Sequence, residues 1–170
     1  MKSNRNKIVL VIVLGILLIF FLKSFIQFRI NRIDNIYYTE FKNNLTCTME
    51  ASESFYMHEL TPFTWEKMYI MKPYTSKKEM NEIVGIKWTT YNTYLGYLWE
   101  GKTYLGNNPL DDDIFHKLVF VNKEKVILDI TIMRNLADFT NIDNIVLINE
   151  DFFQIDKTNK KNPIIKRIDV

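Results

Sequence analysis

The sequence has few of the residues on which recognisable active sites depend. Among 170 residues there are one cysteine, two histidines, five glycines and four prolines. A lone cysteine excludes an internal disulfide and a cysteine-rich zinc site, because each needs further thiols. The sequence also contains no glycine-rich phosphate loop, serine elbow or paired-cysteine motif. The absence of these residues and motifs gives little support for catalysis and predicts no cofactor.

A strong excess of either charge is also missing. The formal net charge is +2, yet residues 24–170 carry 20 acidic against 18 basic residues. The positive excess therefore comes from the amino-terminal flank and not from a basic surface, so we expect no nucleic-acid partner. The 22 isoleucines and 17 asparagines are typical of a protein from an AT-rich bacterial genome.

One long apolar run stands out against this background. The 15 residues Ile8 to Leu22 lie between Lys7 and Lys23 and include no charge. At about 1.5 Å per residue the run alone is short for a bilayer core of ~30 Å, but its extension to Phe28 reaches roughly 31 Å. Because Lys23 can extend its amine toward the headgroups, residues 8–28 are predicted to form a transmembrane signal anchor after a basic start at residues 1–7.

Two alternatives to an anchor remain open, a cleaved secretion signal and a buried helix of a soluble domain. The anchor is favoured because bulky residues follow Leu22 where a cleavage site needs small ones, and Cys47 is too distant for a lipoprotein signal. Basic residues flank the run almost equally, with Lys2, Arg5 and Lys7 before it and Lys23, Arg29 and Arg32 after it. The basic start favours a cytoplasmic amino terminus and an extracytoplasmic domain.

After the anchor, the spacing of apolar residues predicts an amphipathic helical stalk over residues 29–45. Steps of three and four residues connect Ile26, Ile30, Ile33, Tyr37, Phe41 and Leu45, and Asn43-Asn44 is expected to end the helix. The stalk is expected to pack on its own domain, with a coiled-coil interface as the alternative. Residues 46–156 are expected to form one soluble domain, followed by a basic tail over residues 157–170.

Within the domain, the patterns indicate an α+β fold with an antiparallel sheet of about four to six strands and a short helix on one face. Ser76 and Glu79 form a capping box that starts the helix, and Gly85 is placed to end it with a positive φ. Cys47, expected as a small buried residue, lies on an alternating pattern typical of a strand. The segments expected to be extended are 46–51, 67–71, 86–88, 94–99, 102–105, 117–121, 126–133 (hairpin-paired with 117–121) and 152–155.

One segment of the domain resembles a known group of proteins. Phe63-Thr64-Trp65-Glu66-Lys67, then Tyr69-Ile70 and Pro73-Tyr74-Thr75-Ser76, resemble a stretch in small membrane-anchored or lipoprotein-like proteins of low-GC Gram-positive bacteria. The resemblance covers about residues 63–85. It implies that cellular setting, but no activity and no catalytic residues.

The candidate reactive residues are few and scattered. His58 and His116 have no metal-binding companion at helical or strand spacing, and each is expected to be an ordinary structural residue. Asp111, Asp112 and Asp113 supply enough oxygens for a weak calcium candidate, although adjacent acids suit a solvated loop better. A membrane-tethered hydrolase would have to assemble its site from His58, His116 and Asp111–Asp113 by folding.

A cluster of aromatic residues is the strongest indication of a binding function in the sequence. Six of them fall within 17 residues: Trp88, Tyr91, Tyr94, Tyr97, Trp99 and Tyr104. A strand buried on both faces has this composition, but exposed rings would mark a surface for a protein, a glycan or a bilayer interface. The sequence thus favours a membrane-anchored, non-enzymatic binding or accessory module, such as an envelope-complex subunit or an immunity-type protein, over the tethered hydrolase.

Overall fold

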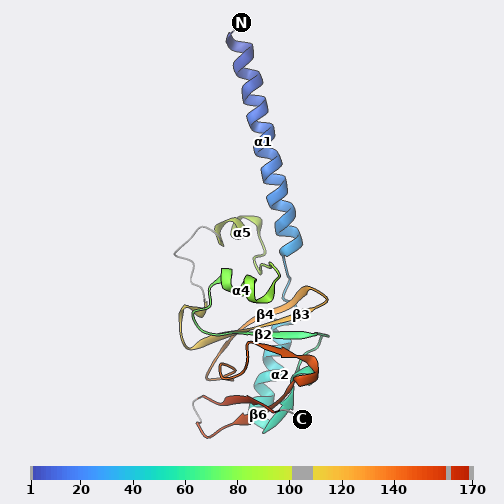
Figure 1. Cartoon of the computed structure of the whole chain (residues 1–170), viewed down its shortest axis with the longest axis vertical. Coiled ribbons are helices and arrows are strands. Elements are labelled where there is room, and N and C mark those ends of the chain that lie inside the picture. The colour runs from blue at the N-terminus through green and yellow to red at the C-terminus, as the bar shows by residue number, and fades with distance from the viewer. Residues whose placement is uncertain (1, 101–108, 160–161, 169–170) are drawn as a thin grey trace. The chain divides into compact units, whose positions relative to one another are not determined.

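The computed structural model describes residues 2–100, 109–159 and 162–168. The chain forms two compact units, residues 1–32 with 91–104 and residues 33–90 with 105–170. Together their elements confirm an α+β fold: a long apolar helix at the amino terminus, antiparallel sheets and short helices (Figure 1).

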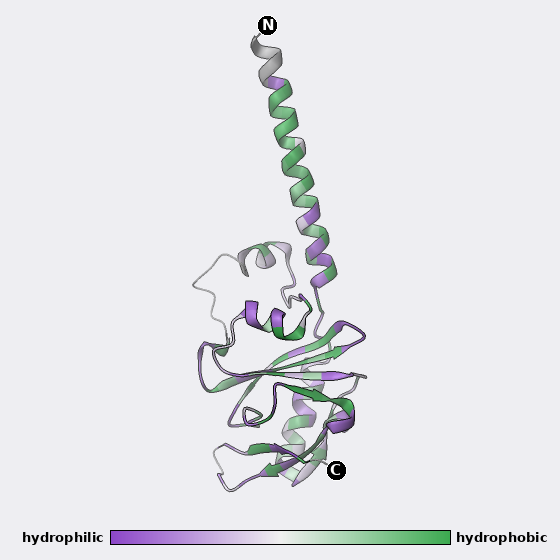
Figure 2. Cartoon of the chain, in the orientation of Figure 1, coloured by the Kyte–Doolittle hydropathy of each residue, from purple (hydrophilic) through white to green (hydrophobic). Residues whose placement is uncertain are grey.

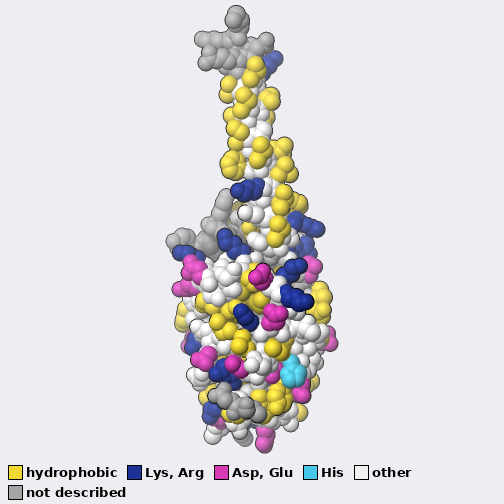
Figure 3. Space-filling view, turned by 45° about the vertical axis from the view of Figure 1, so that its right-hand side comes forward, with side chains coloured by type: hydrophobic (Ala, Val, Ile, Leu, Met, Phe, Trp, Pro, Cys, Tyr) yellow, Lys and Arg dark blue, Asp and Glu magenta, His cyan; other side chains and the backbone are white. Residues whose placement is uncertain are grey.

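The first unit is built on helix α1 (Lys2–Asn31). Its segment Lys7–Asn31 contains an 18-residue stretch with a mean hydropathy of 2.9 and is, by length and composition, long and apolar enough to cross a membrane. Figure 2 colours most of this helix as hydrophobic, and Figure 3 shows apolar side chains along the face of the helix that is in view. The large apolar side chains from Ile8 to Leu22 are each 47–68% exposed, unlike those of a core helix in a soluble protein.

A short helix, α5 (Tyr94–Glu100), completes the first unit. The Thr93 hydroxyl accepts a hydrogen bond from the Gly96 backbone N–H at 3.2 Å, and the Thr93 carbonyl accepts one from Tyr97 N–H. Thr93 therefore acts as the amino-terminal cap of α5. The expectation that residues 94–99 are extended is wrong, because a capped helix forms there.

The second unit centres on a four-stranded antiparallel sheet in the order β4-β3-β2-β5 (Figure 1). The strands are β2 (Lys67–Met71), β3 (Phe115–Asn122), β4 (Lys125–Met133) and β5 (Ile145–Leu147). Both faces of this sheet are buried. Along β3, Leu118 and Phe120 pack into one core while Val119 and Val121 pack into another, as the two-residue period of a strand requires.

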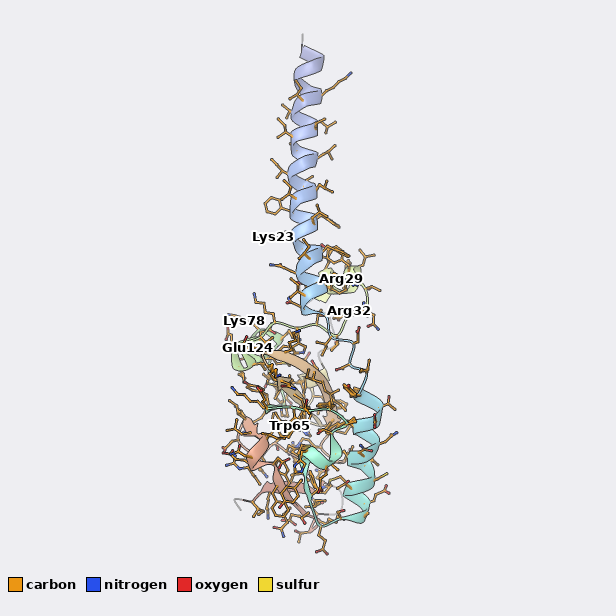
Figure 4. All side chains as sticks on the ribbon, turned by 90° about the vertical axis from the view of Figure 1, so that its right-hand side faces the viewer. Lys23, Arg29, Arg32, Trp65, Lys78 and Glu124 are labelled. Carbon is orange, nitrogen blue, oxygen red and sulfur yellow. The ribbon has the colours of Figure 1, made fainter. Side chains whose placement is uncertain are left out.

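The larger core lies between this sheet, helix α2 (Tyr38–Ala51) and a second antiparallel sheet. The second sheet has the order β1-β6-β7, from β1 (Ser54–Tyr56), β6 (Phe152–Asp156) and β7 (Ile164–Arg167). Trp65, labelled in Figure 4, packs edge-on against Phe120 with ring centroids 5.5 Å apart. Short helical turns α3 (Met57–Leu60), η1 (Pro109–Asp111) and η2 (Ile148–Glu150) connect the strands.

Helix α4 (Lys77–Val84) contributes Met80 and Val84 to the smaller core, on the other face of the four-stranded sheet. The predicted capping box is confirmed: Glu79 N–H donates to the Ser76 hydroxyl, and the Glu79 carboxylate accepts from Ser76 N–H at 2.7 Å. Gly85 ends the helix with φ of 74°, also as predicted. The β3–β4 hairpin and strands at 67–71 and 152–155 are confirmed as well.

Three other expectations are wrong. Residues 46–51 belong to α2 and not to a strand, because Phe41, Leu45 and Met49 form its buried stripe at helical spacing and leave Cys47 exposed. The stalk expected over residues 29–45 is not one helix, since α1 ends at Asn31 and α2 begins at Tyr38. Asn43-Asn44 accordingly does not end a helix.

The segment expected as a loose basic tail also contains structure. Strand β7 pairs with β6 across four residue pairs, and Ile165 is fully buried in the larger core. The apolar pair Ile164-Ile165 lets β7 pack into this core. The lysines on both sides of the pair make the same segment look like a polar tail in the sequence. The expected strand over residues 86–88 has no counterpart either, while the one over residues 102–105 lies outside the described residues.

Candidate functional site

The aromatic-rich segment does not form one surface. Within the first unit, Tyr94 on α5 lies against three phenylalanines of α1, with centroid distances of 5.5 Å to Phe21, 5.3 Å to Phe25 and 5.7 Å to Phe28. Tyr97 lies 5.4 Å from Phe28. Edge-to-face and tilted geometries of this kind are the favourable arrangements of aromatic pairs. Two members of the predicted patch therefore hold α5 against α1.

The remaining members of the predicted patch have different positions. Trp88 is buried in the second unit, so its place in an exposed patch is wrong. Tyr91 is exposed, and Trp99 is 69% exposed at the end of α5, close in exposure to Leu95 at 75%. Tyr104 lies outside the described residues. Leu95 and Trp99 are thus the most exposed apolar side chains in the described part of this segment, and they lie four residues apart on one helix face.

Trp88 instead belongs to a buried polar network centred on Asp129 of β4. The Asp129 carboxylate accepts a hydrogen bond from Trp88 Nε1 at 2.6 Å and pairs with Lys117 Nζ at 2.6 Å. Asn35, at φ of 51°, donates to the Asp129 carbonyl and accepts from its N–H. The Asn35 side-chain amide thereby makes the two hydrogen bonds that the backbone of a neighbouring strand would make at the outer edge of β4. Every polar atom named has a partner, which is typical of a structural network.

His58 forms the one histidine–carboxylate pair among the described residues. Its Nδ1 lies 2.7 Å from Asp151 Oδ2, which also accepts from the His58 backbone N–H. Asp151 is buried, whereas the His58 side chain is half exposed. A carboxylate bonded to Nδ1 fixes the ring and directs Nε2 away from it, the geometry of an oriented general base. His58 lines an open groove of about 460 Å³ together with Thr61, Pro62, Phe63, Thr64, Trp65 and Ile148.

His116 has a different setting. It lies on β3, fully buried against the Phe139 ring at 5.7 Å, and neither ring nitrogen has a hydrogen-bond partner among the described residues. Burial lowers the pKa of His116 to about 4, with Asp138 opposing the shift and Arg134 adding to it. The ring is therefore neutral at pH 7 and acts as a core side chain.

The neighbouring Asp138 carboxylate is held by two residues. Arg134 donates to Asp138 Oδ2 from Nε and Nη2 at 2.9 and 2.8 Å, and Thr140 donates to Oδ1. Burial raises the pKa of Asp138, but the hydrogen bonds from Arg134 and Thr140 hold it below its usual value. This pair anchors the turn after β4.

The residues proposed for a hydrolase site have no contact in common. His58 pairs with Asp151 and His116 packs against Phe139, while the three acids at 111–113 are exposed. Asp112 Oδ1 accepts from Ile114 N–H in a local turn. Among the described residues, no group of three or more His, Cys, Asp or Glu side chains is arranged to hold a metal ion. The assembly of His58, His116 and Asp111–Asp113 that the alternative of a tethered hydrolase requires is not seen.

A small cleft lies at the end of the β3–β4 hairpin strands. Its volume is about 210 Å³, and Ile114 and Met133 expose 48% and 49% of their surface there. The remaining lining residues are polar: Asp113, Arg134, Asn135 and Asn162. Pockets for small molecules have typical volumes of about 300–1,000 Å³. This cleft is the right size for one or two side chains of a partner.

Sequence reasoning missed Asp151, Asp129 and the Arg134–Asp138 pair. Asp151 is 93 residues from His58 and Asp129 is 41 residues from Trp88, so no local spacing connects them. The Arg134–Asp138 pair was detectable in principle, because the two charges are four residues apart. The sequence matches no family model, and no curated protein or solved structure shows significant similarity to it, so the resemblance over residues 63–85 stays a prediction.

Proposed function

We propose that this protein is a single-pass, membrane-anchored binding or accessory module of a bacterial cell membrane. Helix α1 anchors it, and the second unit binds a protein of the cell envelope on the extracytoplasmic side. The observation that carries the proposal is the continuous exposure of apolar side chains from Ile8 to Leu22. A helix of this composition is stable in hydrocarbon and poorly stable in water.

The small cleft supports a binding role for the second unit. Its two exposed apolar side chains, Ile114 and Met133, lie beside the guanidinium of Arg134 and two asparagine amides. Apolar contact surrounded by hydrogen-bonding groups is the usual composition of a protein-recognition site. Because the cleft is smaller than typical substrate pockets, it suits a projecting side chain of a partner better than a substrate.

Cys47 gives a direct test of the proposed side of the membrane. It is the only cysteine and is exposed on α2. In intact cells, a membrane-impermeant maleimide should label the wild-type protein, and the Cys47→Ser variant should stay unlabelled. Labelling only after the cells are opened would contradict the extracytoplasmic placement.

A photocrosslinking amino acid tests the proposed binding surface. We expect one discrete adduct from position 133 in intact cells, and none from position 125, which is exposed at the start of the same strand. Ile114→Glu should abolish the adduct by placing a charge in the cleft. An equal pattern of adducts from both positions would contradict binding at the cleft.

A tethered hydrolase is the second candidate, and the His58–Asp151 pair is the observation in its favour. If His58 is a general base, hydrolysis of p-nitrophenyl acetate should exceed that of buffer and fall to background in His58→Gln. A binding module predicts equal rates for the two proteins. Loss of activity in His58→Gln with an unchanged fold would favour the enzyme.

A further inference from the structure

We infer that helix α5 is an interfacial helix that inserts Leu95 and Trp99 into the bilayer that α1 crosses. The inference rests on the proposed anchoring by α1 and adds a second membrane contact to it. Its occupant is lipid, at the boundary between headgroups and acyl chains.

The contacts of Tyr94 with α1 determine the depth of α5 relative to the apolar segment. Tyr94 contacts Phe21, which belongs to the apolar run, and also Phe25 and Phe28, which follow Lys23. Seven residues of helix cover about 10 Å, so Tyr94 lies alongside the last 10 Å or so of the apolar segment. The start of α5 is therefore fixed at the level where α1 leaves the hydrocarbon.

The composition of α5 suits a position at the membrane interface. Its seven residues, Tyr94 to Glu100, contain no charge before the last position. One face, with Tyr94 and Tyr97, packs on α1. The face with Leu95 and Trp99 exposes most of both side chains, although both are large and mainly apolar. Trp and Tyr are enriched at membrane–water interfaces, where an apolar ring and a polar N–H or O–H are both accommodated.

Basic side chains of α1 lie close to α5 along the helix. Lys23 and Arg29 project from α1 in the segment that contacts α5 (Figure 4). Basic side chains at this level can reach lipid phosphates while their carbon chains stay in the interface. The contacts to Phe21, Phe25 and Phe28, the exposed Leu95–Trp99 face and the flanking cations all suit the same interfacial layer of lipid.

The test uses full-length protein in vesicles of phosphatidylcholine and phosphatidylglycerol. In a Cys47→Ser background, nitroxide labels are placed at Leu14→Cys, Leu95→Cys and Lys125→Cys, and their collisions with oxygen and with a water-soluble nickel chelate are measured. Positions 95 and 125 are exposed, so labels there should not disturb folding. We expect the label at 95 to be several-fold less accessible to the chelate than that at 125, and the label at 14 to be the most protected.

Trp99 provides a second readout without a label. Trp65 and Trp88 are buried in the second unit, so lipids brominated near the headgroup should quench mainly Trp99 emission. Trp99→Phe should remove that quenching. If position 14 is protected but position 95 is as accessible as 125 and Trp99→Phe leaves quenching unchanged, the inference fails and the anchor stands. If position 14 is accessible to the chelate, the anchoring fails and the inference fails with it.

Discussion

At the scale of single residues, the second unit depends on buried polar groups whose partners come from distant parts of the chain. Asp129 joins Trp88, Lys117 and Asn35, which lie on three separate segments. Burying a carboxylate is costly unless its oxygens are bonded and its charge is paired, and both conditions hold here. The network fixes how the segment before α2 and the segment after α4 meet the edge of the sheet.

The first residue-scale prediction concerns Asp129→Ala. The change leaves the Lys117 ammonium, which is mostly buried, without its counter-charge, and it removes the acceptor of Trp88. We expect a loss of about 3–5 kcal/mol in the free energy of unfolding, measured by denaturant titration in detergent micelles. Glu82→Ala is the control, because it breaks the exposed Lys78–Glu82 pair and should cost at most about 0.5 kcal/mol. Similar losses in both variants would contradict the role of the network.

The second residue-scale prediction concerns pH. The folded protein holds the pKa of His116 at about 4, below its ordinary value of 6.5, because the ring is buried. The unfolded chain therefore binds more protons between these values, and stability falls as pH is lowered from 6.5 to 4, by about 3 kcal/mol for this group. His116→Leu should flatten this part of the stability–pH curve. An unchanged slope in the variant would show that other groups cause the dependence.

At the scale of elements, helix α4 and the β3–β4 hairpin have identifiable local determinants. Gly85 has φ of 74°, a region that other residues enter at a cost. Gly85→Ala should therefore destabilise the protein by about 1 kcal/mol, and Gly85→Asn by less, since Asn tolerates this conformation better. The measurement is the midpoint of denaturant unfolding. Equal stability of the wild type and the alanine variant would contradict the account of the helix end.

The hairpin turn allows a stabilising prediction. Lys123 and Glu124 connect β3 and β4 with φ of 45° and 61°, although neither residue favours positive φ. Two positive φ angles in a two-residue loop are typical of a type I′ turn, for which Asn-Gly is preferred. The double change Lys123→Asn/Glu124→Gly should stabilise the protein by about 1–2 kcal/mol, seen as a higher unfolding temperature. A lower unfolding temperature would contradict the turn assignment.

These elements also show which parts of the fold the sequence could reveal. Helix α4 was predictable because Ser76, Glu79 and Gly85 carry its start and end signals within ten residues. Only the first half of α2 was predicted, from the helical spacing of Phe41 and Leu45, because the alternation at Cys47, Met49 and Ala51 masks the continuation of the buried stripe to Met49. The His58–Asp151 pair could not be predicted from the sequence either, because the two residues come together only when β1 and β6 pair.

At the scale of the whole molecule, the chain combines a long helix with exposed apolar side chains and a folded α+β unit. The second unit has two buried cores, one on each face of its four-stranded sheet, which suits a stable surface for recognition. Helix α1 of the first unit carries the longest run of exposed apolar side chains in the described part of the chain. We propose that the membrane covers this surface.

The most direct test of the account is whether α1 integrates into a bilayer. Full-length protein incorporated into phospholipid vesicles should float with them after treatment with alkaline carbonate, which removes proteins bound only at the surface. Leu14→Lys/Leu18→Lys should stay unbound, because each charge near the centre of a spanning helix costs about 2.5–3.5 kcal/mol, whereas Leu14→Ala/Leu18→Ala should still float. Release of the wild-type protein by carbonate would contradict the proposal that α1 is a membrane anchor.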